Sequence, residues 1–148
     1  MKNSLSLEDI YNLAYNTLTK GGSCSEQAEA AAQTILSAEQ DGSASHGLFR
    51  LPGYFNSLIS GKVNLNPNPS LHKVTKAVLK CDGDRSFAPL IHKLYLNELI
   101  KSTKEIGIGV LSIQRVAHFS SLWPETETLA ESGLIGIACT SYLPVVSP

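Results

Sequence analysis

The sequence VTKAVLKCDGDRSFAPLIHKLYLNELIKSTKEIGIGVLSIQRV, residues 74–116, contains two β-type runs separated by an amphipathic helical pattern. The first run, Val74 to Cys81, is closed by the turn sequence Asp82-Gly83-Asp84. Pro89 to Glu105 carries leucine and isoleucine at helical spacing, and Ile108 to Val116 forms the second β-type run. A helix between two strands in this order is typical of an α/β fold.

The same alternation continues toward the C-terminus. Pro124 to Ser132 opens with Pro-Glu-Thr-Glu, and acidic side chains suit the positive end of a helix. Leu134 to Thr140 is an almost continuous apolar run, which is expected of a strand buried on both faces. We therefore predict three strands that alternate with two helices between residues 74 and 140.

The residues that precede this pattern predict helices. Ser6 is a candidate N-cap because Leu7, Glu8 and Asp9 follow it. Ser23 and Glu26 resemble a capping box at the start of a second helix. The first predicted helix runs from Leu7 to a stop at Gly21-Gly22, and the second from Ser23 or Ser25 to about Asp41-Gly42. A third is predicted from about Gly47 to Ser60, with Pro52 in its first turn. Residues 64–70 are predicted to form a loop.

Composition excludes several classes of protein. Hydrophobic residues make up 43% and charged residues 17% of the 148 residues, with a net charge of -1, which is typical of a globular chain. No basic stripe indicates a nucleic-acid partner, no apolar run reaches the length of a membrane span, and the first residues lack the apolar core of a signal peptide. Three widely spaced cysteines fit neither a disulfide framework nor a zinc site, so we expect buried thiols, no metal and a cytoplasmic location.

The first cluster of chemically useful residues is SASHGLFRLPGY, residues 43–54. A helix that began near His46 would place His46, Arg50 and Tyr54 on one face. Imidazole can carry a proton near neutral pH, and guanidinium can bind a carboxylate through two parallel hydrogen bonds. Spacing alone favours a structural interpretation, in which Ser45 is an N-cap, His46 a structural polar residue and Arg50 a partner in a surface ion pair.

The second cluster is QRVAHFSSLWP, residues 114–124, between a predicted strand and a predicted helix. Ligands of open α/β sheets bind at the carboxyl ends of strands, and a helix N-terminus attracts anionic groups. His118, Ser120 and Ser121 are therefore candidate ligand-binding residues, although His118 could instead be structural. We interpret Trp123 as a core residue and His72 and His92 as surface residues. No Gly-x-Gly-x-x-Gly occurs, so a Rossmann dinucleotide site is not supported.

Taken together, these stretches resemble one known family. The sequence SHGLFRLPGY, residues 45–54, resembles the N-terminal signature of the type-2 malate/L-lactate dehydrogenases. The stretch from His118 through GLIGIA at residues 133–138 to Pro144-x-x-Ser-Pro148 resembles the family's next block. Many members have an Asn-His-Phe-Gly type of sequence there. The run HFSSLWPE at residues 118–125 is instead similar to the branch that reduces Δ1-piperideine-2-carboxylate and Δ1-pyrroline-2-carboxylate.

The resemblance implies a role for most of these residues. Ser45 and His46 would belong to a proton relay, and Arg50 with Tyr54 would bind the substrate and its carboxylate. His118, Phe119, Ser120, Ser121 and Leu122 would line the site of NADPH, or alternatively NADH, while some members give the histidine a catalytic role. The enzyme would be a cytoplasmic homodimer. Residues 1–72 would form a helical segment for dimerisation and substrate binding, and residues 73–148 the start of a non-Rossmann, mixed-sheet cofactor domain.

Family members are more than twice as long as this chain, and an aspartate that completes the relay would lie beyond residue 148. We therefore expect an N-terminal fragment without activity of its own. Two alternatives stay open at this point. The protein could be a 2-hydroxyacid dehydrogenase that acts on malate, lactate or ureidoglycolate. It could also be a non-catalytic module whose helical half serves dimerisation.

Overall fold

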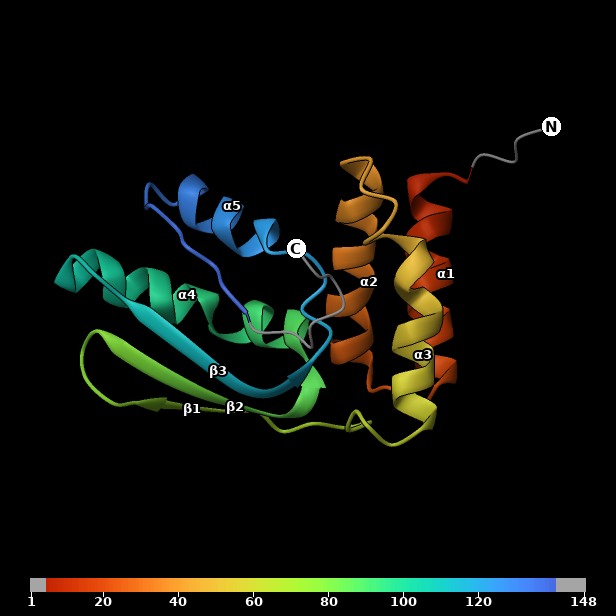
Figure 1. Cartoon of the computed structure of the whole chain (residues 1–148), viewed down its shortest axis with the longest axis horizontal. Helices are drawn as coiled ribbons and strands as arrows, with labels where there is room; N and C mark the ends of the chain where they lie inside the picture. Colours follow the sequence, from red (N-terminus) through yellow and green to blue (C-terminus); the bar gives the residue numbers. More distant parts are fainter. Residues whose placement is uncertain (1–4, 141–148) are drawn as a thin grey trace, which may run out of the picture.

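The first three α-helices of the chain stand beside one end of a three-stranded sheet (Figure 1). The computed structural model describes residues 5–140. The predicted α/β fold, with a helical segment followed by a mixed sheet, is confirmed. In chain order the elements are α1 (Leu7–Lys20), α2 (Ser25–Gln40), the 3-10 turn η1 (Leu48–Arg50), α3 (Leu51–Ile59), β1 (Ser70–Lys73), β2 (Val78–Phe87), α4 (Ala88–Ile106), β3 (Val110–Ala117) and α5 (Trp123–Glu131).

The N-terminus of α1 is capped by a side chain, whereas that of α2 is not. The predicted N-cap of α1 is confirmed. The Ser6 hydroxyl accepts a hydrogen bond from the Asp9 backbone N–H at 3.1 Å, and the Asp9 carboxylate accepts one from the Ser6 backbone N–H. The predicted capping box of α2 is wrong. Cys24 is the N-cap residue of α2 and makes no side-chain cap. Ser23 is buried, and its hydroxyl accepts from the fully buried Gln27 side chain instead.

The third helix begins later than predicted, at Leu51 rather than near Gly47. Proline is tolerated only in the first turn of a helix, so Pro52 fixes the start of α3. Before it, the chain forms the η1 turn, and the Leu48 backbone N–H donates to the Glu39 carboxylate at 2.7 Å. His46 consequently lies in a turn before the helix.

The sheet has the order β1-β2-β3, with β1 antiparallel and β3 parallel to β2. The crossover between the parallel strands is α4, whose predicted extent is confirmed. Strand β1 was not predicted, because its four residues, mostly exposed, lack an alternating apolar pattern. Strand β2 starts at Val78 and continues through the expected turn at Asp82-Gly83-Asp84, where the register with β3 shifts.

The prediction of a third buried strand at Leu134 to Thr140 is wrong. The described chain has no strand in this segment, and Ile135 and Ile137 are 98% and 89% exposed. A strand requires a neighbouring strand to accept and donate its backbone hydrogen bonds, and β3 pairs only with β2 over residues 5–140. The end of the second family-like block, Pro144 to Pro148, lies outside the described residues.

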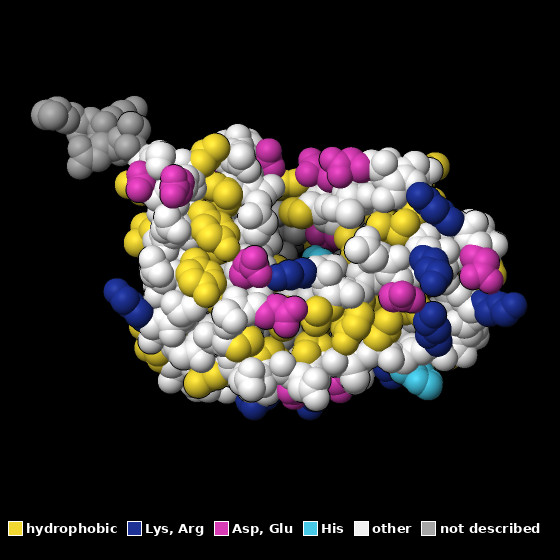
Figure 2. Space-filling view, turned by 180° about the vertical axis from the view of Figure 1, so that it is seen from behind, with side chains coloured by type: hydrophobic (Ala, Val, Ile, Leu, Met, Phe, Trp, Pro, Cys, Tyr) yellow, Lys and Arg dark blue, Asp and Glu magenta, His cyan; other side chains and the backbone are white. Residues whose placement is uncertain are grey.

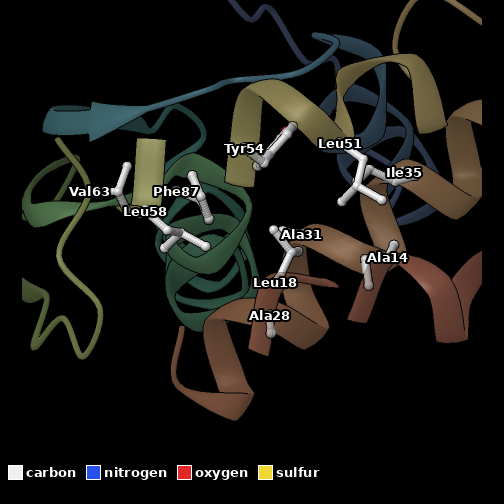
Figure 3. Close-up of a cluster of buried hydrophobic side chains, with 11 residues drawn as sticks. Ala14, Leu18, Ala28, Ala31, Ile35, Leu51, Tyr54, Leu58, Val63 and Phe87 are labelled. Carbon is white, nitrogen blue, oxygen red and sulfur yellow. The ribbon is translucent and has the colours of Figure 1, made fainter. Parts of the chain in front are cut away.

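The main core joins the helices to the sheet. Alanines of α2 are fully buried and let α1 approach closely, while Phe87 inserts from the end of β2 (Figure 3). The Gln27 side chain accepts from the Phe87 backbone N–H at 2.9 Å and donates to the Asn64 carbonyl at 3.0 Å. These contacts fix the end of β2 against α2. The core residues are Ala14, Leu18, Ala28, Ala31, Ala32, Ile35, Leu51, Tyr54, Leu58, Val63 and Phe87.

The surface carries charges of both signs. On the face shown in Figure 2, acidic and basic side chains are interspersed among apolar ones. Among the helices within residues 5–140, none combines the length and the apolar character needed to cross a membrane.

Replacing Gly83 with alanine is expected to lower the free energy of unfolding by about 2 kcal/mol. A Cβ at Gly83 would overlap the Val116 side chain and lie 3.1 Å from the Arg115 carbonyl oxygen, so two strands would have to separate. Urea unfolding of the chain measures the effect. Gly53→Ala is the matched control, because its Cβ would meet nothing closer than His118 at 3.9 Å and α3 would gain a better helix former. Equal stability of the two variants would contradict the packing described for β2 and β3.

Candidate functional site

His46 is surrounded by hydroxyl groups of its own turn. Its Nδ1 lies 3.0 Å from Ser45 Oγ and 3.3 Å from Ser43 Oγ. The Trp123 ring packs edge-on against the imidazole, with centroids 5.5 Å apart, and its indole N–H donates to Asp41. Trp123 therefore is not the core residue that we predicted, since it is half-buried and holds one face of His46.

Arg50 lies beside this turn, but Tyr54 does not. The Arg50 Nε donates to the Ser45 carbonyl at 2.9 Å, and the side chain is exposed. Tyr54 is 1% exposed and belongs to the core. The expected single face of His46, Arg50 and Tyr54 is therefore wrong, because α3 begins only at Leu51 and turns Tyr54 inward. The structure brings Ser45, His46 and Arg50 together without it.

His118 is held from three sides just after β3. Its Nε2 lies 2.6 Å from Ser57 Oγ, its ring stacks on Tyr54 at 4.7 Å, and Phe87 packs edge-on at 5.7 Å. Burial lowers the pKa of His118, and the charges of Arg50 and Lys62 lower it further. Near neutral pH the imidazole is therefore uncharged and can share one proton with the Ser57 hydroxyl.

The residues after His118 leave buried polar atoms without partners. The hydroxyls of Ser120 and Ser121 are buried, and neither forms a hydrogen bond within the described part of the chain. The Tyr54 hydroxyl also lacks a hydrogen-bond partner of good geometry among the described residues. Burial raises its pKa to about 12, and the nearby Ser120 hydroxyl and the charge of Arg50 offset this only in part. Buried polar groups normally find partners, so unpaired hydroxyls before a helix N-terminus are what a polar ligand would complete.

The two clusters adjoin one another. Leu122 is the N-cap residue of α5, and the next residue, Trp123, contacts His46. An open pocket of about 340 Å³ lies on this side and is lined by Asp41, Ser43, Trp123 and Glu127. A larger open pocket, about 420 Å³, is lined by residues of α1, α2 and α4 and contains none of the motif residues. Asp41 and Ser57 were not expected from the sequence, because Asp41 meets Trp123 and Ser57 meets His118 only through the fold. Ser43 belongs to the first motif, but no role was expected for it.

His92 was predicted to lie on the surface and is instead largely buried, with 17% of its side chain exposed. Its Nδ1 lies 3.8 Å from Oε2 of Glu125, a carboxyl in the first turn of α5 whose side chain is 9% exposed. Burial lowers the pKa of His92 to about 4 and raises the pKa of Glu125. His72, by contrast, is exposed as predicted and stands in β1.

His92 makes the stability of the chain depend on pH. The unfolded chain binds a proton at His92 below the ordinary pKa of 6.5, whereas the folded chain binds it only near 4. The free energy of unfolding should therefore fall by up to about 3 kcal/mol as the pH drops through this window. Glu125 acts oppositely, since its raised pKa stabilises the fold at low pH and this contribution is lost as the pH rises.

Urea unfolding at pH 7 and pH 4 measures this dependence. His92→Leu should reduce the difference between the two pH values, whereas His72→Leu, at an exposed position, should leave it as in the wild type. A difference unaltered by His92→Leu would contradict the burial of this imidazole.

The cysteines are separate from one another. Cys81 is buried, and burial raises the pKa of its thiol to about 11, which makes it unreactive. Cys24 is half-buried, but Cys139 is exposed, so the expectation of buried thiols is wrong for that residue. Over residues 5–140, no three His, Cys, Asp or Glu side chains gather as metal ligands would.

The sequence of this chain is similar to those of known oxidoreductases. The sequence profile described as malate/L-lactate dehydrogenase matches residues 5–148. A Δ1-pyrroline-2-carboxylate reductase of Ancylobacter novellus is 43% identical over 130 residues, which cover 88% of this chain and 38% of that protein. A Δ1-pyrroline-2-carboxylate/Δ1-piperideine-2-carboxylate reductase of Pseudomonas aeruginosa is 33% identical over 144 residues, covering 97% and 43%.

The fold of this chain is also similar to solved structures of dehydrogenases and reductases. The Δ1-piperideine-2-carboxylate reductase of Pseudomonas syringae pv. tomato superposes with a TM-score of 0.84 at 33% identity, over 89% of this chain and 40% of that one. Malate dehydrogenase of Pyrococcus horikoshii gives a TM-score of 0.81 at 27% identity, over 88% and 38%. The chain thus spans about two fifths of the length of the proteins that it matches.

Proposed function

The chain belongs to the malate/L-lactate dehydrogenase family, and from this we propose that it contributes the N-terminal part of an NAD(P)H-dependent reductase of cyclic imino acids. The substrates would be Δ1-pyrroline-2-carboxylate and Δ1-piperideine-2-carboxylate, and the products proline and pipecolate. The reductases of the two Pseudomonas species and of Ancylobacter support this substrate class. The single observation that carries the proposal is the placement of Arg50 beside the Ser45–His46 pair.

Each of these side chains would act on a different part of the substrate. The exposed Arg50 guanidinium would bind the carboxylate through parallel hydrogen bonds and so fix which face of the C=N bond is presented. The contact between Ser45 Oγ and His46 Nδ1 at 3.0 Å would allow a proton to move between the two groups. This relay would keep the imine nitrogen protonated, which makes the neighbouring carbon electron-poor.

The residues from His118 to Leu122 would hold the nicotinamide cofactor. The unpaired buried hydroxyls of Ser120 and Ser121 suit a polar ligand, and the α5 N-terminus favours its anionic groups. When bound, the cofactor supplies the hydride. The uncharged His118 would line the site, and its ring is oriented by Ser57 and by stacking on Tyr54. Tyr54 would therefore serve the substrate site by supporting His118 from the core.

Several further features belong to the proposal. NADPH is the favoured cofactor, with NADH as the alternative. Residues 1–72 would form the helical dimerisation and substrate segment, and residues 73–148 the start of the cofactor domain, although β1 begins at Ser70. The protein would be a cytoplasmic homodimer without nucleic-acid or membrane partners.

A panel of substrates tests the proposal. The complete product of the gene, including any residues that follow Pro148 in the reading frame, is assayed for oxidation of NADPH and NADH. We expect turnover with the two cyclic imines and little with oxaloacetate or pyruvate. The similar TM-score of malate dehydrogenase favours a 2-hydroxyacid dehydrogenase as the second candidate. Reduction of the keto acids without reduction of either imine would support that candidate and overturn ours.

A further inference from the structure

A buried acid–base pair joins α4 to the second sequence motif, because Glu125 is the last residue of the run 118–125 whereas His92 belongs to no motif. His92 stands on α4 and Glu125 on the first turn of α5, and their nearest polar atoms, Nδ1 and Oε2, are 3.8 Å apart. This separation is too long for a hydrogen bond. Oε2 of Glu125 has no hydrogen-bond partner within the described residues, although the residue is 7% exposed. The buried, unpaired Oε2 needs an explanation, because burial of a polar atom without a partner is costly.

The pair borders the segment that we propose to hold the cofactor. The Phe119 ring lies 6.4 Å from the His92 ring, and Glu125 follows Leu122, the N-cap residue of α5, by three positions. Leu122 provides no side-chain cap, and the start of α5 is held on the end of α2 by the indole N–H of Trp123, which donates to Asp41. The same turn approaches α4 through the contact between Glu125 and His92.

We propose that His92 and Glu125 are positioning residues for the cofactor, and that they close into a direct hydrogen bond when it occupies residues 118–122. A shift of about 1 Å would bring Nδ1 and Oε2 to bonding distance. The closed pair would fix the first turn of α5 on α4, and with it the preceding hydroxyls of Ser120 and Ser121. Neither residue would touch the reacting atoms. The inference rests on the proposed function, because it takes the ligand of this segment to be a nicotinamide cofactor.

Steady-state kinetics of the complete gene product test the inference. Glu125→Leu and His92→Leu should each raise the KM for NADPH about tenfold and change kcat and the KM for the imine less than about twofold. The double variant should be no worse than either single one, because both remove the same contact. Glu125→Gln should stay within about threefold of the wild type, since an amide can still bond to imidazole. Glu131→Leu, exposed at the end of α5, is the matched control and should change nothing.

Direct binding separates this inference from the proposed function. The dissociation constant of NADPH is measured on the complete gene product, where quenching of the fluorescence of Trp123, at the start of α5, reports occupancy of the neighbouring segment. Weaker NADPH binding in both leucine variants would support the inference even if no imine were reduced. Two results would overturn the inference even if imines were good substrates. One is an unchanged NADPH dissociation constant in folded His92→Leu and Glu125→Gln/His92→Leu proteins. The other is an NADPH dissociation constant of the double leucine variant that shows the added effects of both single substitutions.

Discussion

Replacing Arg50 with alanine is expected to lower kcat/KM for Δ1-pyrroline-2-carboxylate on the order of a thousandfold in the complete gene product. The guanidinium is exposed at the site, and only its Nε is engaged, by the Ser45 carbonyl, within residues 5–140. Its terminal nitrogens are therefore available for a carboxylate. Much of the loss should appear as a higher KM for the imine, with the KM for NADPH nearly unchanged, since the cofactor would bind at residues 118–122.

Arg50→Lys separates charge from geometry. Lysine keeps the positive charge but cannot form two parallel hydrogen bonds, so we expect an intermediate loss of roughly tenfold to a hundredfold. The folding of each variant is checked by its urea unfolding, which should match the wild type because Arg50 is exposed. An Arg50→Ala enzyme with wild-type kcat/KM would contradict the assignment of this residue to the substrate carboxylate.

Replacing His46 with alanine is expected to lower kcat about a thousandfold, the usual range for removal of a general acid–base group. The imidazole contacts the Ser45 hydroxyl, the Ser43 hydroxyl and the Trp123 ring. Proton delivery to the imine nitrogen should then become limiting, and the pH dependence of kcat should change shape. Binding of NADPH should be nearly unaffected.

Two serine variants locate the relay. Ser45→Ala should lower kcat more than Ser43→Ala, because Ser45 Oγ is the nearer of the two to His46 Nδ1 and the resemblance places Ser45 in the relay. The two substitutions remove the same group from the same turn, so they are matched controls for one another. A larger effect at Ser43, or a His46→Ala enzyme with normal kcat, would show that the proton takes another route.

The elements with strong local signals could be predicted from the sequence. Helix α4 has apolar residues at helical spacing over its whole length, and α1 has both a serine cap and a glycine stop. Strand β3 is a continuous β-type run after Gly109. In each case the pattern that predicts the element lies within the element itself, so distant contacts were not needed.

The features that depend on distant contacts could not be predicted in this way. Strand β1 exists only because β2 pairs with it, and Leu134 to Thr140 has strand composition without a neighbouring strand. Tyr54 turns into the core because Pro52 delays the start of α3. The amphipathic pattern of its helix predicts a surface position for His92. The side chain is buried because α5, a segment distant in the sequence, packs against it.

The motifs predicted part of the candidate site. Ser45, His46 and Arg50 were expected together and lie together. The supporting residues Ser57 and Trp123 were not expected, since their contacts with His118 and His46 join segments more than sixty residues apart. Such contacts could be predicted from the sequence only after the topology of the fold was known.

The most direct test of the account is NADPH oxidation with Δ1-pyrroline-2-carboxylate, measured for the 148-residue chain and for the complete gene product under the same conditions. We propose that this chain supplies the carboxylate-binding arginine, the serine–histidine relay and one wall of the cofactor site, while the remainder of the site lies in the part that relatives have in addition. We expect turnover by the complete product and none by residues 1–148 alone. Equal turnover by the isolated chain, or no imine reduction by the complete product, would contradict it.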